Sequence, residues 1–187
     1  MKSKLNQSIL MTVAVLFVSA TLQAQVNKPK MPDAVRDFVK FIGIWEANTT
    51  IMIDTIPHKV FYRMNFRRTA DAYGMNVDEG YTDSTLGNLR AANLVGYNAA
   101  DSKIHWFYAD NLGAAYERIG KWTDSDNLRF EYSRNQNDKK YTEIITYAFY
   151  GNDEFTYTHT SYLDAKQLKK ITGKFERKKA DIPVRKQ

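Results

Sequence analysis

The chain contains no cysteine among its 187 residues. A disulfide framework is therefore excluded, and so is a lipid anchor attached to an N-terminal cysteine. The stability of the fold must then come from a buried core. The length is that of one domain and is ample to form such a core.

Histidine is almost as scarce, with only His58, His105 and His159. Metal sites need clustered His, Cys, Asp or Glu ligands, and this spacing predicts no metal site. The sequence also lacks a glycine-rich phosphate loop and a Gly-x-Ser-x-Gly nucleophile motif. Asp78 and Glu79 are adjacent, so on a strand they point to opposite faces and cannot form a carboxylate pair. We therefore expect no cofactor and no enzymatic activity.

Long hydrophobic runs are limited to one, Ile9 to Val18, which carries no charge. Lys2 and Lys4 precede it, and Ala24 is the best cleavage point after it. This is the pattern of a secretory signal peptide over residues 1–24. The run is about half of the roughly 20 residues that a membrane span needs, which disfavours the alternative of a membrane anchor. We expect a periplasmic or secreted protein with no transmembrane span after cleavage.

The net charge is +6, and the basic excess is concentrated near the C-terminus. Residues 25–31 read as a linker, residues 32–180 as the folded domain and residues 181–187 as a basic tail. Export removes the usual nucleic-acid partner, so we expect no nucleic-acid binding. Weak attraction of the tail to an anionic membrane or glycan surface remains open.

A short helix is predicted directly after the linker. Pro32 and Asp33 suit a first helical turn, and Gly43 ends the helix. The apolar positions fall at i, i+3, i+4 and i+7, which predicts one buried helical face made of Val35, Phe38, Val39 and Ile42.

From Gly43 onward the apolar pattern alternates with a period of two, which is typical of β-strands. Turn-forming residues, including Pro57-His58, divide it into ten predicted strands: 44–54, 58–68, 73–82, 90–98, 103–110, 114–123, 127–134, 140–149, 154–162 and 168–178. Short connections favour hairpins between neighbours, and closure into a ring leaves no open edge. The sequence thus predicts an all-β fold, a closed antiparallel up-and-down β-barrel; a sandwich is the alternative.

Several motifs carry a family resemblance: Gly43-Ile44-Trp45, Leu94-Val95-Gly96-Tyr97-Asn98, Lys103-Ile104-His105-Trp106, Asp110-Asn111-Leu112-Gly113, Gly120-Lys121-Trp122 and Phe175-Glu176-Arg177-Lys178. Together they resemble the calycin, or lipocalin-like, superfamily, and most of all a family of small exported bacterial domains of unknown function. The resemblance implies that Arg177 from the last strand lies on Trp45 of the first strand and closes the barrel. Nitrobindin-type relatives bind haem through a histidine, but no histidine here aligns with that ligand.

Strand parity predicts which side chains face the barrel interior. The inward sets are Trp45, Ala47, Thr49, Ile51 and Ile53; Val60, Tyr62, Met64 and Phe66; Tyr73, Met75, Val77, Glu79 and Tyr81; Ile104, Trp106 and Tyr108; Leu128, Phe130 and Tyr132; Ile145, Tyr147 and Phe149; and Phe155, Tyr157 and His159. In the sixth strand, parity leaves open whether Arg118 or its neighbour Glu117 faces inward. The candidate cavity residues are Glu79, Trp106, Arg118, Tyr147, Tyr157 and His159.

Each polar candidate has a structural alternative. Glu79 anchors a ligand head group if it is inside, where it needs a partner or a shifted pKa, or it lies at the strand rim. Arg118 anchors an acidic ligand or forms an exposed ion pair with Glu117. His159 joins Tyr157 and Tyr147 in a polar patch or is a structural histidine.

The expected function is binding of a small hydrophobic or amphipathic ligand in the barrel cavity of an exported protein. The alternative is an envelope protein-interaction or structural module that uses the barrel exterior and binds no small ligand. The sequence does not determine the oligomeric state or the identity of the ligand.

Overall fold

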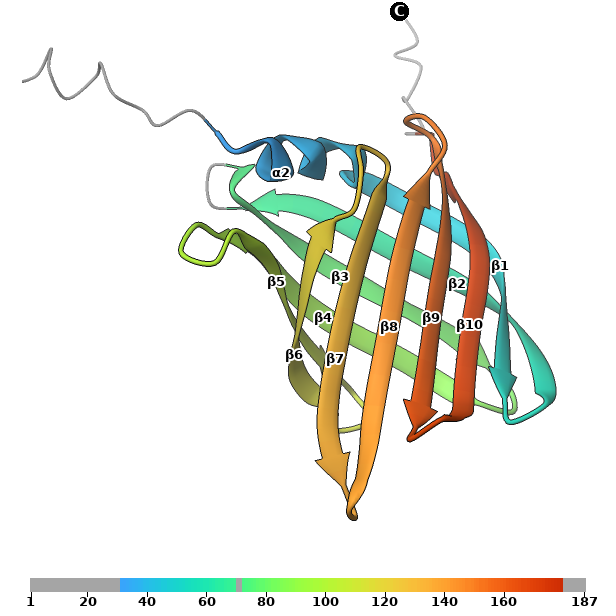
Figure 1. The fold of residues 1–187 in the computed structure, drawn as a ribbon. Helices are drawn as coiled ribbons and strands as arrows, with labels where there is room; N and C mark the ends of the chain where they lie inside the picture. The colour runs from blue at the N-terminus through green and yellow to red at the C-terminus, as the bar shows by residue number, and fades with distance from the viewer. Residues whose placement is uncertain (1–30, 70–71, 180–187) are drawn as a thin grey trace, which may run out of the picture. The chain divides into compact units, whose positions relative to one another are not determined.

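The alternating segments fold as antiparallel strands in a computed structural model that describes residues 31–69 and 72–179 (Figure 1). The ten strands are β1 (Gly43–Ile53), β2 (Ile56–Thr69), β3 (Gly74–Asp83), β4 (Gly87–Asn98), β5 (Lys103–Asp110), β6 (Ala115–Trp122), β7 (Asn127–Gln136), β8 (Lys139–Phe149), β9 (Glu154–Leu163) and β10 (Lys166–Arg177). The expected signal peptide (1–24), the linker (25–31) apart from Met31, and the basic tail (181–187) lie outside the described residues.

Each strand pairs with its neighbours in sequence, and β1 also pairs with β10, which closes the barrel. In the closing pair, Trp45 lies opposite Arg177 and Ile51 lies opposite Ile171. The predicted closed up-and-down β-barrel is therefore confirmed, and the sandwich alternative is wrong. Closure satisfies the backbone hydrogen bonds that the two edge strands of an open sheet would leave unpaired.

The first hairpin turns earlier than the sequence pattern indicates. Pro57 and His58 lie within β2 rather than in the turn, and the chain reverses at Asp54 and Thr55. Asp54 has a φ of 51°, a left-handed conformation that Asp tolerates better than most residues. Proline is acceptable so close to the start of a strand, where fewer ladder hydrogen bonds depend on its missing N–H.

The predicted helix forms, but with a different buried face. It starts as α2 (Asp33–Arg36) and tightens into the 3-10 helix η1 (Asp37–Lys40). In a 3-10 helix residues three apart lie on one face, so Val35, Phe38 and Phe41 are buried. Val39, which the α-helical pattern places inside, is 53% exposed. Within the described residues no helix is long and apolar enough to cross a membrane.

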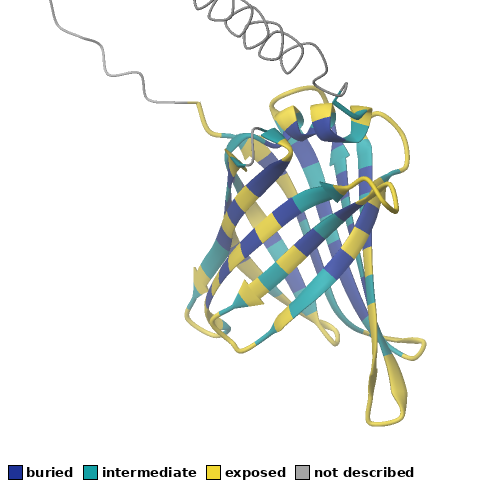
Figure 2. Cartoon of the chain, turned by 90° about the vertical axis from the view of Figure 1, so that its left-hand side faces the viewer, coloured by how far each residue is buried: buried dark blue, intermediate teal, exposed yellow. Residues whose placement is uncertain are grey.

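The helical segment lies across one end of the barrel, which we call the helix end (Figures 1 and 2). The Trp122 indole donates a hydrogen bond to the Ala34 carbonyl over 3.2 Å, and Lys40 pairs with Asp126 at 2.9 Å. These contacts hold the segment against the β6–β7 connection and cover the helix end of the core. The opposite end is formed by the β1–β2, β3–β4, β5–β6, β7–β8 and β9–β10 turns and is called the turn end.

Buried and exposed residues alternate along the strands, as Figure 2 shows. The alternation follows the predicted parity at most inward positions, and it settles β6, where Arg118 faces inward and Glu117 faces out. Two of the predicted inward residues, Ile53 and Tyr73, are each 37% exposed, although Ile53 does line the barrel interior as predicted. Ile53 is the last residue of β1, and Tyr73 precedes β3, so both lie at the barrel rims beyond the last core layer.

The interior is divided into two chemically different layers. Toward the helix end, aromatic rings pack densely: Phe41 lies 4.9 Å from Phe66 and 4.7 Å from Phe149, and Trp45 lies 4.6 Å from Phe155 between ring centroids. Toward the turn end, the buried residues include charged and hydroxyl-bearing side chains instead. Because burying such groups is costly unless they are paired, this polar layer is where a functional site is expected.

Candidate functional site

Glu79 of β3 is a buried member of this polar layer and is only 6% exposed. Its carboxylate accepts hydrogen bonds from the Tyr62 hydroxyl at 2.9 Å and from the Asn93 amide at 3.1 Å. Burial raises the pKa of Glu79 more than the charge of Arg118 and these two donors lower it. The rim position considered for Glu79 is therefore wrong, since β3 continues to Asp83 and Glu79 shares the inward parity of the buried Met75 and Val77.

Arg118 and Glu143 form a buried ion pair at the centre of the layer. Their side chains are 5% and 6% exposed, and Arg118 Nη2 lies 3.3 Å from Glu143 Oε2. The guanidinium also lies against two tyrosine rings, 4.4 Å from the centroid of Tyr108 and 4.9 Å from that of Tyr116. The expected surface pair of Arg118 with Glu117 is wrong, because adjacent strand residues face opposite sides and Glu117 instead contacts His105 at 2.6 Å.

Glu143 remains ionised although it is buried. Burial on its own raises the pKa of Glu143, but the neighbouring His159 side chain, the charge of Arg118 and the Tyr141 hydroxyl together hold the pKa well below its usual range. Tyr116 and Tyr141 donate to its two oxygens at 2.8 Å and 2.6 Å. The carboxylate is thus satisfied from three sides by side chains of β6 and β8.

Arg118 is not satisfied to the same extent. It donates to the Tyr116 hydroxyl at 2.6 Å, but its Nε is buried with no hydrogen-bond partner in the described part of the chain. Burial alone would lower the pKa of Arg118, yet Tyr116 and Glu143 raise it, so the guanidinium stays charged. A buried donor without a partner costs about 1–3 kcal/mol.

His159 of β9 lies beside this pair and is neutral near pH 7. Its Nε2 is 3.4 Å from Glu143 Oε2 but makes no hydrogen bond of acceptable geometry within the described residues. Burial is the main reason that its pKa is lowered to about 4, despite the attraction of Glu143. The centroid of the Tyr157 ring lies 6.4 Å from that of the His159 ring.

Two predicted site residues, Trp106 and Tyr147, belong to the aromatic layer rather than to the polar one. Their rings stack 5.8 Å apart at 15°, and Trp106 also packs against Phe130 at 5.2 Å. The indole nitrogen of Trp106 is buried and has no hydrogen-bond partner among the described residues. Both residues form the floor of the polar layer, whereas Glu79, Arg118, Tyr157 and His159 lie within it.

Lys169 of β10 joins the layer and was missed by sequence reasoning. It is part of a predicted strand, but a β-bulge between Gln167 and Lys169 shifts the register. Lys169 is two residues before the buried Ile171, so strand alternation places it on the inner face. This alternation is the sequence signal that could have identified Lys169. Burial lowers the pKa of Lys169 below its usual value.

Two hollows open among these side chains. One of about 220 Å³ is lined by residues that include Ile51, Glu79, Tyr157 and Ile171, and one of about 380 Å³ is lined by residues that include Tyr132 and Glu143. Six residues line both: Tyr108, Asp110, Leu112, Arg118, His159 and Lys169. The two hollows therefore meet at the turn end, and their shared wall carries a guanidinium, an imidazole, an ammonium group and the Asp110 carboxylate.

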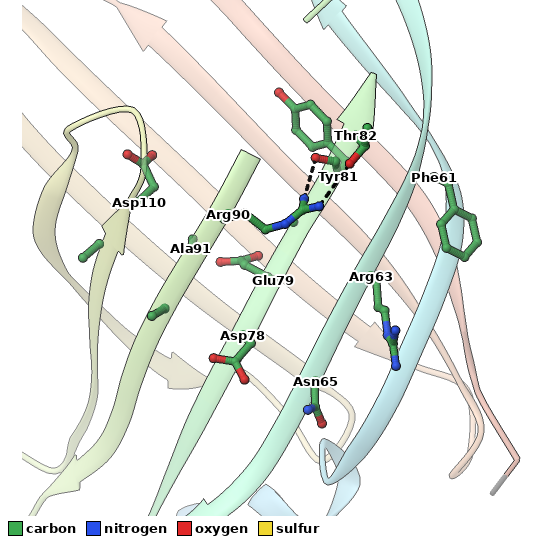
Figure 3. Close-up of a pocket in the computed structure, with 13 residues that line it drawn as sticks. Phe61, Arg63, Asn65, Asp78, Glu79, Tyr81, Thr82, Arg90, Ala91 and Asp110 are labelled. Atoms are coloured by element: carbon green, nitrogen blue, oxygen red, sulfur yellow. Dashed lines mark hydrogen bonds between the residues drawn. The ribbon is translucent and has the colours of Figure 1, made fainter. Parts of the chain in front are cut away.

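A larger hollow of about 890 Å³ lies on the outer face of β2 to β5 (Figure 3). Arg90 lies along β3 there and donates to the Tyr81 carbonyl at 2.9 Å and to Thr82 at 3.1 Å. Gly80 permits this close approach, since a Cβ there would lie 2.3 Å from the Leu89 carbonyl oxygen. The groove is shallow and its polar groups are exposed, so it lacks the buried, convergent chemistry of the barrel interior.

The side chains of the polar layer can bind a ligand through hydrogen bonds and charge. Within the described residues, no group of three His, Asp or Glu side chains is arranged to hold a metal ion. The exposed trio of His105, Asp101 and Glu117 joins one imidazole to two carboxylates at 2.9 Å and 2.6 Å, on the outer face. The fold and the interior layer together define a lipocalin-like ten-strand barrel with a polar internal site.

One solved structure shows a similar fold, and a second one matches with a low TM-score. The chain is similar to an S-type phycobiliprotein lyase from Guillardia theta, with 10% identity over 81% of this chain and 95% of that one and a TM-score of 0.55. A Bacteroides fragilis protein provisionally assigned to the outer membrane matches 79% of this chain and 100% of its own at 11% identity, with a TM-score of 0.23. No family model and no curated protein sequence matches the chain. At such identities the likeness to the lyase shows the fold alone.

Proposed function

We propose that this chain is an exported protein that binds one small amphipathic molecule inside the turn end of its barrel. The observation that carries the proposal is the pair of hollows of about 220 and 380 Å³ that meet at Arg118, His159 and Lys169. Ligand sites are typically concave, mostly apolar and equipped with a few convergent polar groups. The barrel supplies concavity and convergent polar groups at one end, and the lining of its hollows is at least as polar as it is apolar.

The lining favours an amphipathic ligand over a purely apolar one. Ile51, Ile171 and Leu89 offer apolar contacts in the smaller hollow. Tyrosine rings surround both hollows, and each adds a hydroxyl to its apolar ring. A purely apolar ligand would cover the charged wall without replacing the hydrogen bonds that water gives it, at a cost in free energy.

Export rests on the predicted signal peptide over residues 1–24 and is part of the proposal. The likeness to the phycobiliprotein lyase supports the barrel as a scaffold that can serve small-molecule chemistry. An enzymatic role has one observation in its favour, the shifted pKa values of Glu143 and His159 at a cavity wall. The contacts of Glu143 with Arg118 and Tyr141, and the burial of His159, account for these pKa shifts without catalysis. We therefore favour ligand binding over an enzymatic role.

The alternative role, as an interaction module, has support on the outer face. Leu94 and Phe107 lie directly opposite each other on β4 and β5 and are 49% and 50% exposed. They lie on the same outer surface as the groove of Figure 3. Adjacent exposed apolar side chains of this size are typical of contact surfaces between proteins.

Native mass spectrometry of the chain, expressed with its leader in a bacterial host and purified without detergent, tests the proposal. We expect an additional small mass that disappears on denaturation. The variant Ala114→Trp should lose it, because Ala114 lines the larger hollow from a loop and an indole there fills the space. Ala99→Trp, in the exposed β4–β5 turn at the helix end, is the matched control.

A small mass that survives in Ala114→Trp would place the ligand elsewhere and contradict the proposal. A bare chain that also fails to take up any of a panel of added amphipaths would contradict it as well. A dimer that is lost in Phe107→Ser, with no small mass, would establish the interaction role instead.

A further inference from the structure

Lys169 is a half-buried cation of the polar layer that has no carboxylate partner among the described residues. Arg134, which also lines the larger hollow without an ion pair in the described part of the chain, is exposed and donates to Gln136 at 3.0 Å. Along the same strand, Lys166 pairs with Asp54 at 3.7 Å and Lys174 pairs with Glu154 at 2.7 Å, both at the surface. Lys169 lines both internal hollows, is half-buried, and forms no ion pair with any described residue. A half-buried ammonium without a partner is costly, and a ligand anion at this position would offset the cost.

The acidic groups around Lys169 are already engaged by other donors. Glu143 forms an ion pair with Arg118 and accepts hydrogen bonds from two tyrosine hydroxyls. Asp110 accepts from the Tyr108 hydroxyl at 2.8 Å and from the backbone N–H groups of Leu112 and Ala114, both at 2.9 Å. Glu79 is engaged by Tyr62 and Asn93. Each of these carboxylates is held in its present position by these donors, and none forms an ion pair with Lys169.

The second cation at the junction of the hollows, Arg118, also retains hydrogen-bonding capacity. Its Nε has no partner, and only its Nη2 is committed to Tyr116 and Glu143. Two cations on one shared wall, one unpaired and one partly satisfied, form a site for a single anionic group. A carboxylate fits it best, since it accepts several hydrogen bonds with two oxygens and adds little volume to these small hollows.

We propose that the ligand is an amphipathic carboxylate, whose head group lies between Lys169 and Arg118 and whose apolar part lies among the tyrosine rings. This inference rests on the proposed function and adds the chemical class of the ligand. Lys169 forms the new ion pair, and Arg118 donates a hydrogen bond while it keeps its contact with Glu143. The neutral imidazole of His159 bounds the site on the β9 side.

The test compares octanoate with 1-octanol, a pair of probes that share the alkyl chain and differ in the head group. Isothermal titration of the delipidated chain should show octanoate binding at least about tenfold more tightly, because a charge-assisted hydrogen bond contributes roughly that factor. Lys169→Met should remove the preference, Lys169→Arg should retain most of it, and Lys166→Met, an exposed change on the same strand, should leave it unchanged.

Equal affinity for the two probes, or a preference that survives in Lys169→Met, overturns the carboxylate assignment and leaves the cavity-binding function intact. Binding of neither probe also overturns it, and the proposed function then depends on the native mass spectrum alone. If circular dichroism shows that Lys169→Met does not fold, Lys169→Gln is titrated with the same two probes, and a preference that survives in Lys169→Gln overturns the assignment.

Discussion

The Arg177 guanidinium lies over the indole ring of Trp45, with its central carbon 4.2 Å from the ring centroid. The two residues are direct partners in the β1–β10 ladder, at the point where the barrel closes. Arg177 also donates to the carbonyls of Ile42 and Lys40 before β1, and to the Asn152 carbonyl at 2.9 Å in the β8–β9 turn. One side chain thus ties the first strand, the last strand and a neighbouring hairpin together at the helix end.

Arg177→Met should therefore lower the free energy of unfolding by about 3 kcal/mol, from lost hydrogen bonds to carbonyls and a lost cation–π contact. Urea denaturation followed by tryptophan fluorescence measures this change. Lys174→Met, at an exposed ion pair on the same strand, should have a much smaller effect. Equal losses in the two variants would show that the contact with Trp45 does not stabilise the closure.

Glu143→Gln should destabilise the barrel by about 3–5 kcal/mol, because it leaves the Arg118 charge buried without a counter-charge. Glu131→Gln is the matched control, since Glu131 pairs with Arg129 on the exposed side of β7. The comparison of their urea midpoints measures the difference. A loss in Glu143→Gln as small as that of the control would mean that water reaches Arg118 freely.

His159 should make the stability depend on pH. The pKa of His159 is lowered to about 4 in the folded state, below its usual value of 6.5, so the unfolded chain binds the extra proton more readily. Stability from this residue is present above pH 6.5 and is lost as the pH falls toward 4. Relative to His159→Gln, the wild-type chain should lose about 2 kcal/mol between pH 7 and pH 5. Parallel stability curves for the two proteins would contradict the neutral, buried imidazole.

Glu79 should make the stability depend on pH in the direction opposite to His159. The pKa of Glu79 is raised above its usual value of 4.5, so its contribution to stability is present below pH 4.5 and is lost as the pH rises through the folded pKa. Glu79→Gln resembles the protonated form, and its stability relative to wild type should therefore increase with pH above 4.5. Chemical denaturation at a series of pH values measures the trend. A relative stability that falls with pH would indicate that the buried carboxylate is better satisfied than its two donors allow.

His105 provides an independent check on these assignments. Its pKa is raised, mainly by the hydrogen bond with Glu117, so its stabilisation is present at acidic pH and is lost as the pH rises. His105→Gln should accordingly change the pH dependence in the direction opposite to His159→Gln. Unfolding curves of both single variants, measured in the same buffers, distinguish the exposed imidazole from the buried one.

The sequence by itself determined the strands, the closed barrel and most of the inner face, because period-two alternation is a local property that each strand carries alone. It also placed Trp45 and Arg177 on the first and last strands. Local spacing was misleading where backbone geometry changed, as at Val39 in the 3-10 helix and at Pro57 in β2.

Only the tertiary structure decided the composition of the polar layer. Arg118 and Glu143 lie on β6 and β8 and meet because these strands flank β7 in the closed barrel and both side chains point inward. Whether Glu79 is buried, and whether Lys169 has a partner, depends on side chains from several strands at once. Alternation along one strand predicts which face of the sheet a side chain points to. Charge pairing and cavity shape arise only when ten strands close around one space.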